Sequence, residues 1–382
     1  MEQYDVVVIG LGAMGAATLD QLARRGARVL GIERFGIPHE LGSSGGDTRL
    51  IRKAYFEHPD YVPLLERAYA NWEHLEARTG ERVLFRTGTV YIGRPDGELI
   101  AGSIAAARTH RLAYDELSER DLQTHASVLR LPEGHHGVYE PDGGFVLASR
   151  SIRLFGEEAL HHGAHVLTGV TVREWRRVGA NLHVVTDAAT YRAGRVIVTA
   201  GSWSADLLPG LPTALTVTRQ AIFWLWPEES ERFRLGNFPC WAAEIDGYAE
   251  LFYGFPILPA SFGGQLGFKV AHHAQGEVVA PGAMAPVQAA ELEPVRRALA
   301  NVFTVRLGPL LSMKACMYTW SPDHHFVIDR HPHDDRVIVA CGFSGHGFKF
   351  ASVVGEALAD LALEQRTALP IGFLGLERFR RG

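Results

Sequence analysis

The chain has 382 residues, of which 47% are hydrophobic and 21% are charged, and its formal net charge is −5. This composition indicates a globular protein of about two or three domains and excludes a general attraction for nucleic acid or an anionic membrane. Its three cysteines cannot all pair, which favours a reducing compartment. The N-terminus "MEQYDVVVIG" has no basic region and no apolar run could span a bilayer, so we expect a cytoplasmic protein without a signal peptide.

A strand, a glycine-rich turn and a helix open the chain. "DVVVIG" is typical of a buried parallel strand, Gly10, Gly12 and Gly15 form GxGxxG, and helical spacing continues until Gly26. Such glycines allow a tight turn, close approach of a pyrophosphate and close packing of helix on strand. A second strand, "ARVLGIE", ends at Glu33, which can accept hydrogen bonds from a ribose. The order predicts a dinucleotide site and does not separate NAD from FAD.

The segment "HELGSSGGDTRLIRKAYFEH" offers a second glycine- and serine-rich loop for phosphate. We expect Asp47 or Thr48 to cap a following helix, and Arg49 and Arg52, three residues apart, to share one face of it. Two guanidinium groups on one face suit a carboxylate or an anionic ring, and a solvated basic face has the same spacing.

Two later units repeat the order of strand, glycine turn and helix: "GRVIVTAGSWSADLL" and "DRVIVACGFSGHGFKFASVVGEALADLAL". With the first unit they predict one parallel sheet. Between them, "WAAEIDGYAELFYGF" indicates a hairpin around Asp246 and Gly247, and "LTVTRQAIFWLWP" and "QLGFKVAHH" indicate further antiparallel strands. In the last of these, Lys269 and His273 share one face.

The predicted fold is therefore α/β plus antiparallel β. A Rossmann-type dinucleotide-binding domain would comprise residues 1–85, 148–218 and 323–382. A discontinuous second domain, built on an antiparallel sheet, would comprise residues 86–147 and 219–322.

Two residues near the C-terminal end stand out. Lys349 falls in the first turn of its helix, where a cation opposes the helix dipole at a cost of about 0.3–1 kcal/mol. It either reaches solvent or faces an anion. Cys316 lies in the strand-like run "LLSMKACMYTW", with Lys314 and Tyr318 on its face. A free cysteine is most often a small buried hydrophobe, whereas this electropositive setting favours a thiolate and an attachment point for a cofactor.

The chain resembles the monomeric sarcosine oxidases, the family that also holds N-methyltryptophan oxidase. The resemblance rests on "VVVIGLGAMGAA", "GDTRLIRKAY", "YGFP", "MKACMYTWSPDHHFVID" and "GFSGHGFKF", and it spans essentially the whole chain. It implies a monomer with an FAD-binding domain and a substrate domain. It also implies that FAD is attached covalently through the sulfur of Cys316, on the 8α-methyl group of the ring.

The resemblance further implies roles for individual residues. The implied catalytic residues are Lys269 for oxygen activation, Arg49 over the flavin ring, and Tyr253 and His273 beside the substrate. The implied substrate-binding residues are Arg52 and Lys349, which bind a carboxylate, and Gly45. The expected cofactor-binding residues are Gly10, Gly12, Gly15, Glu33, Arg34, Ser43, Thr48, Val172, Gly201, Cys316, Gly345, Gly347 and Lys349.

The implied reaction is oxidation of an N-methyl (secondary) amino acid such as sarcosine, by hydride transfer from the N-methyl carbon to FAD. The imine hydrolyses to an amino acid and formaldehyde, and O2 reoxidises the flavin and leaves as H2O2. The expected partners are a small N-alkyl amino acid and O2, with no nucleic acid, membrane or metal.

Two departures from the family pattern bear on the substrate. Gly45 stands where sarcosine oxidases commonly have a histidine, and the chain is longer around Ile257 to Ala260. We expect both near the substrate pocket, with room for a bulkier N-alkyl amino acid. The alternatives are a glycine- or D-amino-acid-type oxidase with noncovalent FAD, and a dehydrogenase or flavin subunit that passes electrons to a partner.

Overall fold

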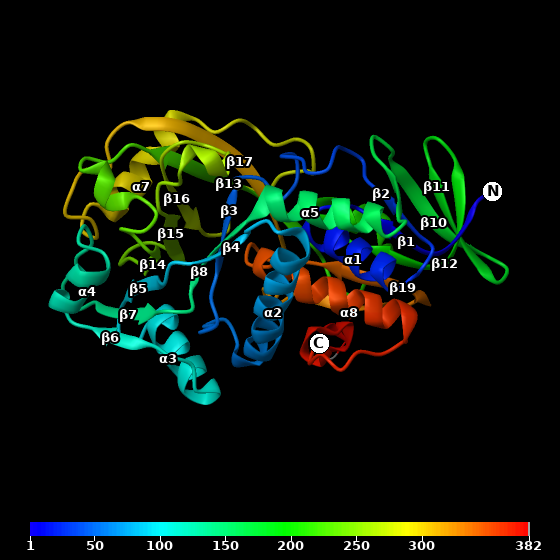
Figure 1. Ribbon diagram of the computed structural model, residues 1–382, viewed down its shortest axis with the longest axis horizontal. Coiled ribbons are helices and arrows are strands. Elements are labelled where there is room, and N and C mark those ends of the chain that lie inside the picture. Colours follow the sequence, from blue (N-terminus) through cyan, green and yellow to red (C-terminus); the bar gives the residue numbers. More distant parts are fainter. Residues whose placement is uncertain (381–382) are drawn as a thin grey trace.

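The computed structural model describes residues 1–380, in which two large sheets lie side by side with a small three-stranded sheet between them (Figure 1). The central strands of the first sheet run parallel in the order β9-β2-β1-β12-β19, as the sequence predicts. Its strands are β1 (Gln3–Ile9), β2 (Val29–Ile32), β9 (His165–Leu167), β10 (Val172–Val178), β11 (Asn181–Thr186), β12 (Thr190–Val198), β18 (Val327–His331) and β19 (Asp334–Cys341).

Helices cover one face of this sheet. Val6 and Val8 of β1 are buried in the core that the helices share, whereas Tyr4, Val7 and Ile9 point to the core on the opposite face. This alternation follows from the period of two along a strand. Helix α1 packs between α5 and α8, and α2 packs on α8 (Figure 1). These helices are α1 (Ala13–Arg24), α2 (Val62–Thr79), α5 (Ala148–His161) and α8 (Ala351–Leu363).

The second sheet has the order β17-β13-β16-β15-β14-β5-β7-β6, and only the β14–β5 pair is parallel among its described neighbours. The predicted hairpin around Asp246 and Gly247 is confirmed, because β14 and β15 pair antiparallel on either side of it. The strands are β5 (Thr89–Gly93), β6 (Asp115–Leu117), β7 (His136–Glu140), β13 (Thr216–Leu225), β14 (Cys240–Glu244), β15 (Leu251–Phe255), β16 (Phe268–His273) and β17 (Leu310–Trp320).

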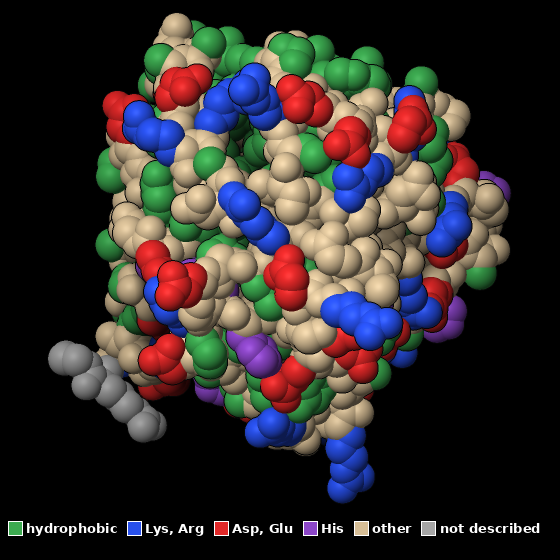
Figure 2. All heavy atoms as spheres, turned by 90° about the vertical axis from the view of Figure 1, so that its left-hand side faces the viewer, with side chains coloured by type: hydrophobic (Ala, Val, Ile, Leu, Met, Phe, Trp, Pro, Cys, Tyr) green, Lys and Arg blue, Asp and Glu red, His purple; other side chains and the backbone are tan. Residues whose placement is uncertain are grey.

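An aromatic core holds this region together. Trp241, Phe268 and Phe303 are buried, with ring centroids 5.2 to 6.3 Å apart. Three helices lie around the sheet, α3 (Glu98–His110), α4 (Glu119–His125) and α7 (Leu292–Leu299). Figure 2 shows the end of the molecule that this region forms, with basic and acidic side chains interspersed over it. Because positive and negative side chains are mixed, this face has no large region of electrostatic potential of one sign.

The segment after the glycine-rich loop is a strand and not the predicted helix. Residues Thr48–Ile51 form β3, which pairs antiparallel with β8 (Gly144–Leu147), and β4 (Leu84–Arg86) completes the small sheet. Asp47 has φ 62°, and its carbonyl accepts from the N–H of Ala148, so the chain turns directly into the sheet. Pairing with a distant strand has overridden the local capping signal.

The helix predicted after Gly201 is short. A 3-10 turn, Gly201–Trp203, leads into α6 (Ser204–Leu207). Further 3-10 turns are Pro59–Tyr61, Ser230–Phe233, Ala260–Phe262, Ala289–Glu291, Phe348–Phe350, Gly372–Leu374 and Leu376–Phe379. Across residues 1–380, no helix has both the length and the apolar character that crossing a bilayer requires. In the same range, no group of three or more His, Cys, Asp or Glu side chains is placed to hold a metal ion.

Substitution of Gly15 and of Gly12 by alanine should affect stability differently. A Cβ atom at Gly15 would lie 1.8 Å from the carbonyl oxygen of Gly10 and 2.7 Å from the Thr199 hydroxyl oxygen, whereas one at Gly12 would meet only the Ser44 hydroxyl, at 3.9 Å. Gly15→Ala should therefore lower the free energy of unfolding by about 1–3 kcal/mol, the usual cost of overpacking. Gly12→Ala should leave it nearly unchanged. Denaturant unfolding of both variants checks this, and equal stability would contradict the close packing of α1 on β1.

Candidate active site

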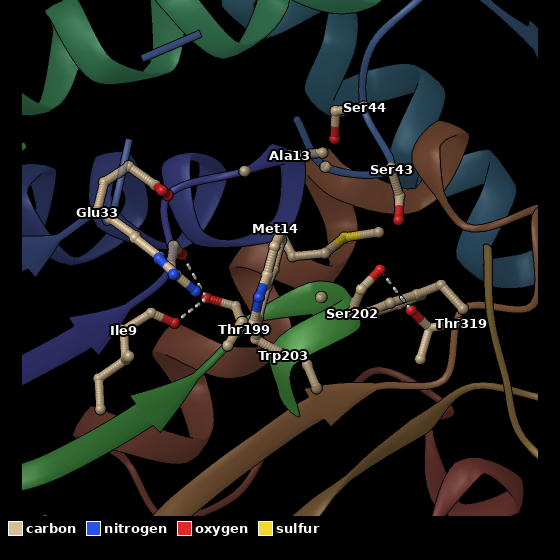
Figure 3. A pocket seen from close by; sticks show the side chains of 18 of the residues that line it. Ile9, Ala13, Met14, Glu33, Ser43, Ser44, Thr199, Ser202, Trp203 and Thr319 are labelled. Atoms are coloured by element: carbon tan, nitrogen blue, oxygen red, sulfur yellow. Dashed lines mark hydrogen bonds between the residues drawn. The ribbon is translucent and has the colours of Figure 1, made fainter. Parts of the chain in front are cut away.

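A large cavity opens at the carboxyl ends of β1, β2, β12 and β19, where a doubly wound sheet binds its ligands. Its volume is about 370 Å³. Figure 3 shows Ser43 and Ser44 approaching it from one side and Ser202 and Thr319 from another. The predicted cofactor-binding residues that line it are Gly10, Gly12, Glu33, Arg34, Ser43, Val172, Gly201, Gly345 and Gly347.

The glycine turn leaves its backbone open to a ligand. Gly10 adopts φ 88°, a left-handed conformation that favours glycine, and a Cβ there would lie 2.8 Å from the carbonyl oxygen of Thr199. The Thr199 hydroxyl donates to the carbonyl of Gly10 at 2.7 Å (Figure 3). Gly15 does not line the cavity within the described chain, and its role is the close approach of helix and strand.

Glu33 is held at the edge of this cavity by its own backbone surroundings. Its side chain accepts from the N–H of Leu11 at 2.7 Å and from the N–H of Phe35 at 2.9 Å. Arg34 lies nearby, with its guanidinium 5.7 Å from the centre of the Trp203 ring. A buried carboxylate with two fixed donors keeps lone pairs free for ribose hydroxyls, and a bare glycine turn receives a pyrophosphate. The residues present therefore fit the dinucleotide FAD.

A second, smaller cavity of about 60 Å³ adjoins the first. Arg49, Tyr318, Gly345 and Phe348 line both, so the two spaces share a wall. The other predicted site residues that line the smaller cavity are Arg52, Tyr253, His273, Cys316 and Lys349. Although Arg49 and Arg52 do not lie on a helix, β3 and the turn after it still bring both to this place.

Arg52 and Lys349 are buried cations on one side of the smaller cavity. The Arg52 guanidinium donates to both carboxylate oxygens of Glu57 at 2.7 Å. Burial opposes ionisation of Glu57, but the charges of Arg52, His346 and Lys349 and the hydrogen bond from Arg52 together outweigh it and lower the pKa of Glu57 to about 2. Burial, together with the charge of Arg52, lowers the pKa of Lys349 to about 7.

Lys349 is held in place by two oxygen atoms. Its ammonium donates to the carbonyl of His346 at 2.8 Å and to the Tyr55 hydroxyl at 3.4 Å. The same hydroxyl lies 2.5 Å from Nδ1 of His346, and burial lowers the pKa of His346 to about 3. The lysine therefore occupies the first turn before α8, as predicted, and points inward and not to solvent.

Neutral polar groups line another part of the smaller cavity. The hydroxyl groups of Tyr253 and Tyr318 lie 3.3 Å apart, and the His273 ring lies 5.4 Å from that of Tyr318. Burial lowers the pKa of His273 to about 4, so this imidazole is neutral near pH 7. Glu250 lies 3.6 Å from it, and burial raises the pKa of Glu250 to about 7.

Arg49 and Lys269 bind the glycine-rich loop by its carbonyl oxygens. Arg49 donates to Ser43 at 2.9 Å, to Thr48 at 2.8 Å and also to Gly45. Lys269 donates to the carbonyl of Gly46 at 2.5 Å, and to the carbonyl and hydroxyl oxygens of Thr48 at 2.8 and 3.1 Å.

The glycine-rich loop therefore separates Lys269 from the two cavities. In the part of the chain that is described, neither Lys269 nor Thr48 lines either cavity. Burial and the charge of Arg49 lower the pKa of Lys269 well below its usual value. Three oxygen acceptors nevertheless match the three donors of an ammonium group.

Cys316 is only 2% exposed and lines the smaller cavity, but its setting does not favour a thiolate in the way the sequence suggested. Burial raises the pKa of its thiol, and the charges of Arg49, Lys269 and Lys314 only partly oppose this. Cys240 and Cys341 are also free and buried, and burial raises the pKa of each to about 12.

The two departures from the family pattern adjoin residues of the smaller cavity but do not line it themselves. A Cβ at Gly45 would lie 2.6 Å from a carboxylate oxygen of Glu40, so the Glu40 side chain occupies that space, and room for a bulkier substrate stays a prediction. Ile257 is buried in the core of the second sheet, and Leu258 packs on the cluster that also holds Leu50 and Tyr253, which line the smaller cavity. Within residues 1–380, neither Gly45 nor residues 257–260 line the cavity.

Tyr55, Glu57 and His346 belong to the site, and the sequence argument did not identify them. All three lie within motifs that were singled out, "RKAYFEH" and "GFSGHGFKF". The sequence does show Glu57 five residues after Arg52, with Tyr55 between them. This spacing alone does not predict that the side chains meet, because their contact depends on how the chain turns after β3.

Comparison with known proteins assigns the chain to a family. The family model described as "FAD dependent oxidoreductase" matches residues 5–361. The chain is 39% identical to a monomeric sarcosine oxidase from Streptomyces avermitilis, over 98% of this chain and 97% of the relative. It is 32% identical to an N-methyl-L-tryptophan oxidase from Yersinia pestis, over 99% of this chain and 100% of that protein.

A solved structure agrees with these relatives. The open form of NikD, described as an unusual amino acid oxidase essential for nikkomycin biosynthesis, is similar with a TM-score of 0.85 and 27% identity, over 98% of each chain. The predicted fold class and family are confirmed. The chain belongs to the FAD-dependent oxidoreductase family and, within it, to the group of the monomeric sarcosine oxidases and N-methyltryptophan oxidases.

Proposed function

We propose that this FAD-dependent amine oxidase oxidises N-methyl amino acids of the sarcosine type. One observation carries the proposal: two buried cations, Arg52 and Lys349, face a cavity that also holds the neutral groups Tyr253 and His273. An N-methyl amino acid has the same polarity, with an anionic carboxylate at one end and an amine that must be neutral to react at the other. The shared wall of Tyr318 and Phe348 brings this cavity against the FAD cavity.

The carboxylate end is bound by charge. Arg52 offers two parallel donors and Lys349 a point charge, and a carboxylate can accept from both. Glu57 occupies Arg52 in the free protein, so the incoming carboxylate has to compete for that guanidinium. Lys349, like Arg49, is bonded only to neutral oxygens, and it lies on the same side of the cavity as Arg52, so an incoming carboxylate can pair with it.

The amine end is bound by neutral groups. FAD, held in the larger cavity, would supply the oxidising chemistry, as acceptor of a hydride equivalent from the N-methyl carbon and donor of electrons to O2, which would leave as H2O2. Tyr253, Tyr318 and neutral His273 orient the amine without repelling it or adding a charge. The product imine hydrolyses to an amino acid and formaldehyde.

The protein holds FAD through the larger cavity. Glu33 is suited to a ribose, the turn from Gly10 to Gly12 to the pyrophosphate, and Cys316 to a covalent bond with the ring. Lys269 supports O2 reduction with its charge, acting from behind Gly46. The other residues that we assign to FAD are Arg34, Ser43, Val172, Gly201, Gly345, Gly347 and Lys349, which line the two cavities. Gly15 and Thr48 would act indirectly, Gly15 by letting α1 approach β1 and Thr48 by holding the glycine-rich loop on Lys269.

We also propose the domain organisation, the cellular location and the oligomeric state of the protein. The strands of the second sheet come from residues 89–140 and 216–320, which supports a discontinuous substrate domain. Three free, buried cysteines support a reducing compartment, and we assign the protein to the cytoplasm. The names of the sarcosine oxidase relatives support a monomer that acts on a small amino acid and O2.

A substrate panel tests the function. Sarcosine, N-methyltryptophan, glycine, a D-amino acid and N-methyl amines without a carboxylate should be compared by release of H2O2 and formaldehyde. We expect peroxide and formaldehyde in equal amounts from N-methyl amino acids and little turnover of decarboxylated amines. Peroxide without formaldehyde from glycine or a D-amino acid would contradict the proposal, as would electron transfer to a dye without peroxide.

Lys349 predicts a pH dependence of ligand binding. Its pKa of about 7 in the free protein means that it is cationic below pH 7 and loses its charge as the pH rises. The dissociation constant of a small carboxylate without an amine should therefore increase by up to about tenfold per pH unit above pH 7. Titration of flavin absorbance from pH 6 to 9 measures this.

Two variants isolate the contribution of Lys349. Lys349→Met should weaken carboxylate binding at pH 6 by about 2–5 kcal/mol and abolish the dependence on pH. Lys53→Met, which removes a lysine paired with Asp142, is the matched control and should behave as wild type. Glu250 also has a pKa of about 7. If Lys349→Met keeps the full pH dependence, the effect belongs to Glu250, and the proposed binding of the carboxylate by Lys349 is contradicted.

Covalent attachment predicts a shift in mass. The denatured wild-type chain should carry the added mass of FAD and keep its yellow colour, and Cys316→Ala should lose both. Cys341→Ala is the control, because Cys341 is buried in the core of the first sheet. An adduct that survives in Cys316→Ala would exclude this cysteine.

Lys269 predicts a difference between the two half-reactions. Lys269→Met should slow reoxidation by O2 far more than anaerobic reduction by substrate, because a cation near the ring stabilises charge that develops on O2. It also removes the charged hydrogen bonds to the carbonyls of Gly46 and Thr48, which keep only the Thr48 N–H and Arg49 as donors, and this should cost about 1–3 kcal/mol of stability. Stopped-flow absorbance separates the half-reactions, and equal slowing of both would make the lysine purely structural.

A further inference from the structure

The glycine-rich loop and the strand that carries Cys316 are joined by an ion pair, Glu40 with Lys314. The pair forms where residue 45 has no side chain, since a Cβ at Gly45 would lie 2.6 Å from the Glu40 carboxylate. Lys314 lies two residues before Cys316 on β17, so both side chains leave the strand on the same face. Because residue 45 has no side chain, the Glu40 carboxylate can lie in that space and contact Lys314 on β17, the strand that carries Cys316.

This pair is connected to the FAD cavity through the loop itself. Ser43 and Ser44, between Glu40 and Gly45, line that cavity (Figure 3). On its other side, the loop is held by Arg49 at the carbonyl of Gly45. Glu40 and Lys314 are partly exposed, with 45% and 28% of their side-chain surfaces accessible, so a contribution to overall stability would be small. Their position points to a local role.

Several titratable groups surround the Cys316 thiol. The cations are Arg49 from β3, Lys269 from β16 and Lys314 from β17, and the neutral phenols are Tyr253 from β15 and Tyr318 from β17. Arg49 and Lys269 donate to oxygen atoms of the glycine-rich loop, whereas Lys314 is paired with Glu40. The thiol faces Gln220 across the strand pair, which brings no charge.

We propose that the Glu40–Lys314 pair seats the glycine-rich loop on β17 and that the Lys314 ammonium stabilises the Cys316 thiolate while FAD is being attached. The attachment exchanges the S–H bond of the cysteine and one C–H bond of the flavin 8α-methyl group for a C–S bond. Two electrons pass to the flavin and from it to O2, which takes up the two protons and leaves as H2O2. Lys314 and Glu40 are positioning residues, and the inference rests on the proposed covalent bond to Cys316.

The test measures attachment and not turnover. Full-length chain produced without flavin is mixed with FAD at pH 6 to 9, samples are denatured at intervals, and the fraction with the mass of the adduct is determined. Noncovalent FAD binding, read from quenching of flavin fluorescence, shows that each variant is folded. Arg86→Met is a matched control, because Arg86 forms a comparable surface ion pair with Glu73.

The two partners should act in opposite directions. Lys314→Met removes a cation from the thiolate, so the pH midpoint of attachment should rise by about one unit, which makes attachment about tenfold slower at pH 7. Lys314→Arg and Arg86→Met should match wild type. Glu40→Gln removes the charge that neutralises Lys314, so its midpoint should fall.

Three results would overturn the inference in distinguishable ways. An unchanged midpoint in Lys314→Met would remove the proposed role of the ammonium. If the pH midpoint of attachment shifts in the same direction in Lys314→Met and Glu40→Gln, the ion pair only holds the loop in place and does not act on the thiol by charge. Absence of any adduct in wild type would instead overturn the covalent attachment itself, and with it that part of the proposed function.

Discussion

The rest of the site depends on the way two cations, half-buried Arg49 and buried Lys269, bind the backbone of the glycine-rich loop. Arg49 and Lys269 come from different sheets, and their donors converge on the carbonyl oxygens of residues 43–48. Buried carbonyl groups and buried charges are each costly alone, and here each satisfies the other. The loop is one wall of the FAD cavity and β3 continues from it to Arg49 and Arg52, so this interaction sets the position of both cavities.

The distribution of charge then determines what can bind. The larger cavity presents a bare glycine turn and the fixed carboxylate of Glu33, which suit pyrophosphate and ribose. The smaller one presents Arg52, already balanced by Glu57, and Lys349, balanced only by neutral oxygens. An anionic group is therefore favoured near Lys349, and a neutral one near His273. The two ends of an amino acid would be distinguished by burial and charge and not by shape alone.

Much of this was predictable from local pattern. The GxGxxG unit, the later strand–glycine–helix units and the hairpin at Asp246 each depend on short-range chemistry, and the structure has all of them. The strand at Thr48–Ile51 was not predictable, because its partner β8 lies nearly a hundred residues away. For the same reason the space beside Gly45 looked open, since Glu40 fills it only after the loop has folded back. The partners of Arg52 and Lys349 likewise depend on tertiary structure.

The most direct test of the carboxylate orientation is a crystal structure of the FAD-loaded protein with a bound carboxylate ligand that cannot be oxidised. The account predicts that the carboxylate oxygens lie within about 3.2 Å of nitrogen atoms of both Arg52 and Lys349. It also predicts that the other end of the ligand lies beside Tyr253 and His273, toward the shared wall with the larger cavity. A carboxylate bound away from Lys349, with Arg52 still paired to Glu57, would contradict it.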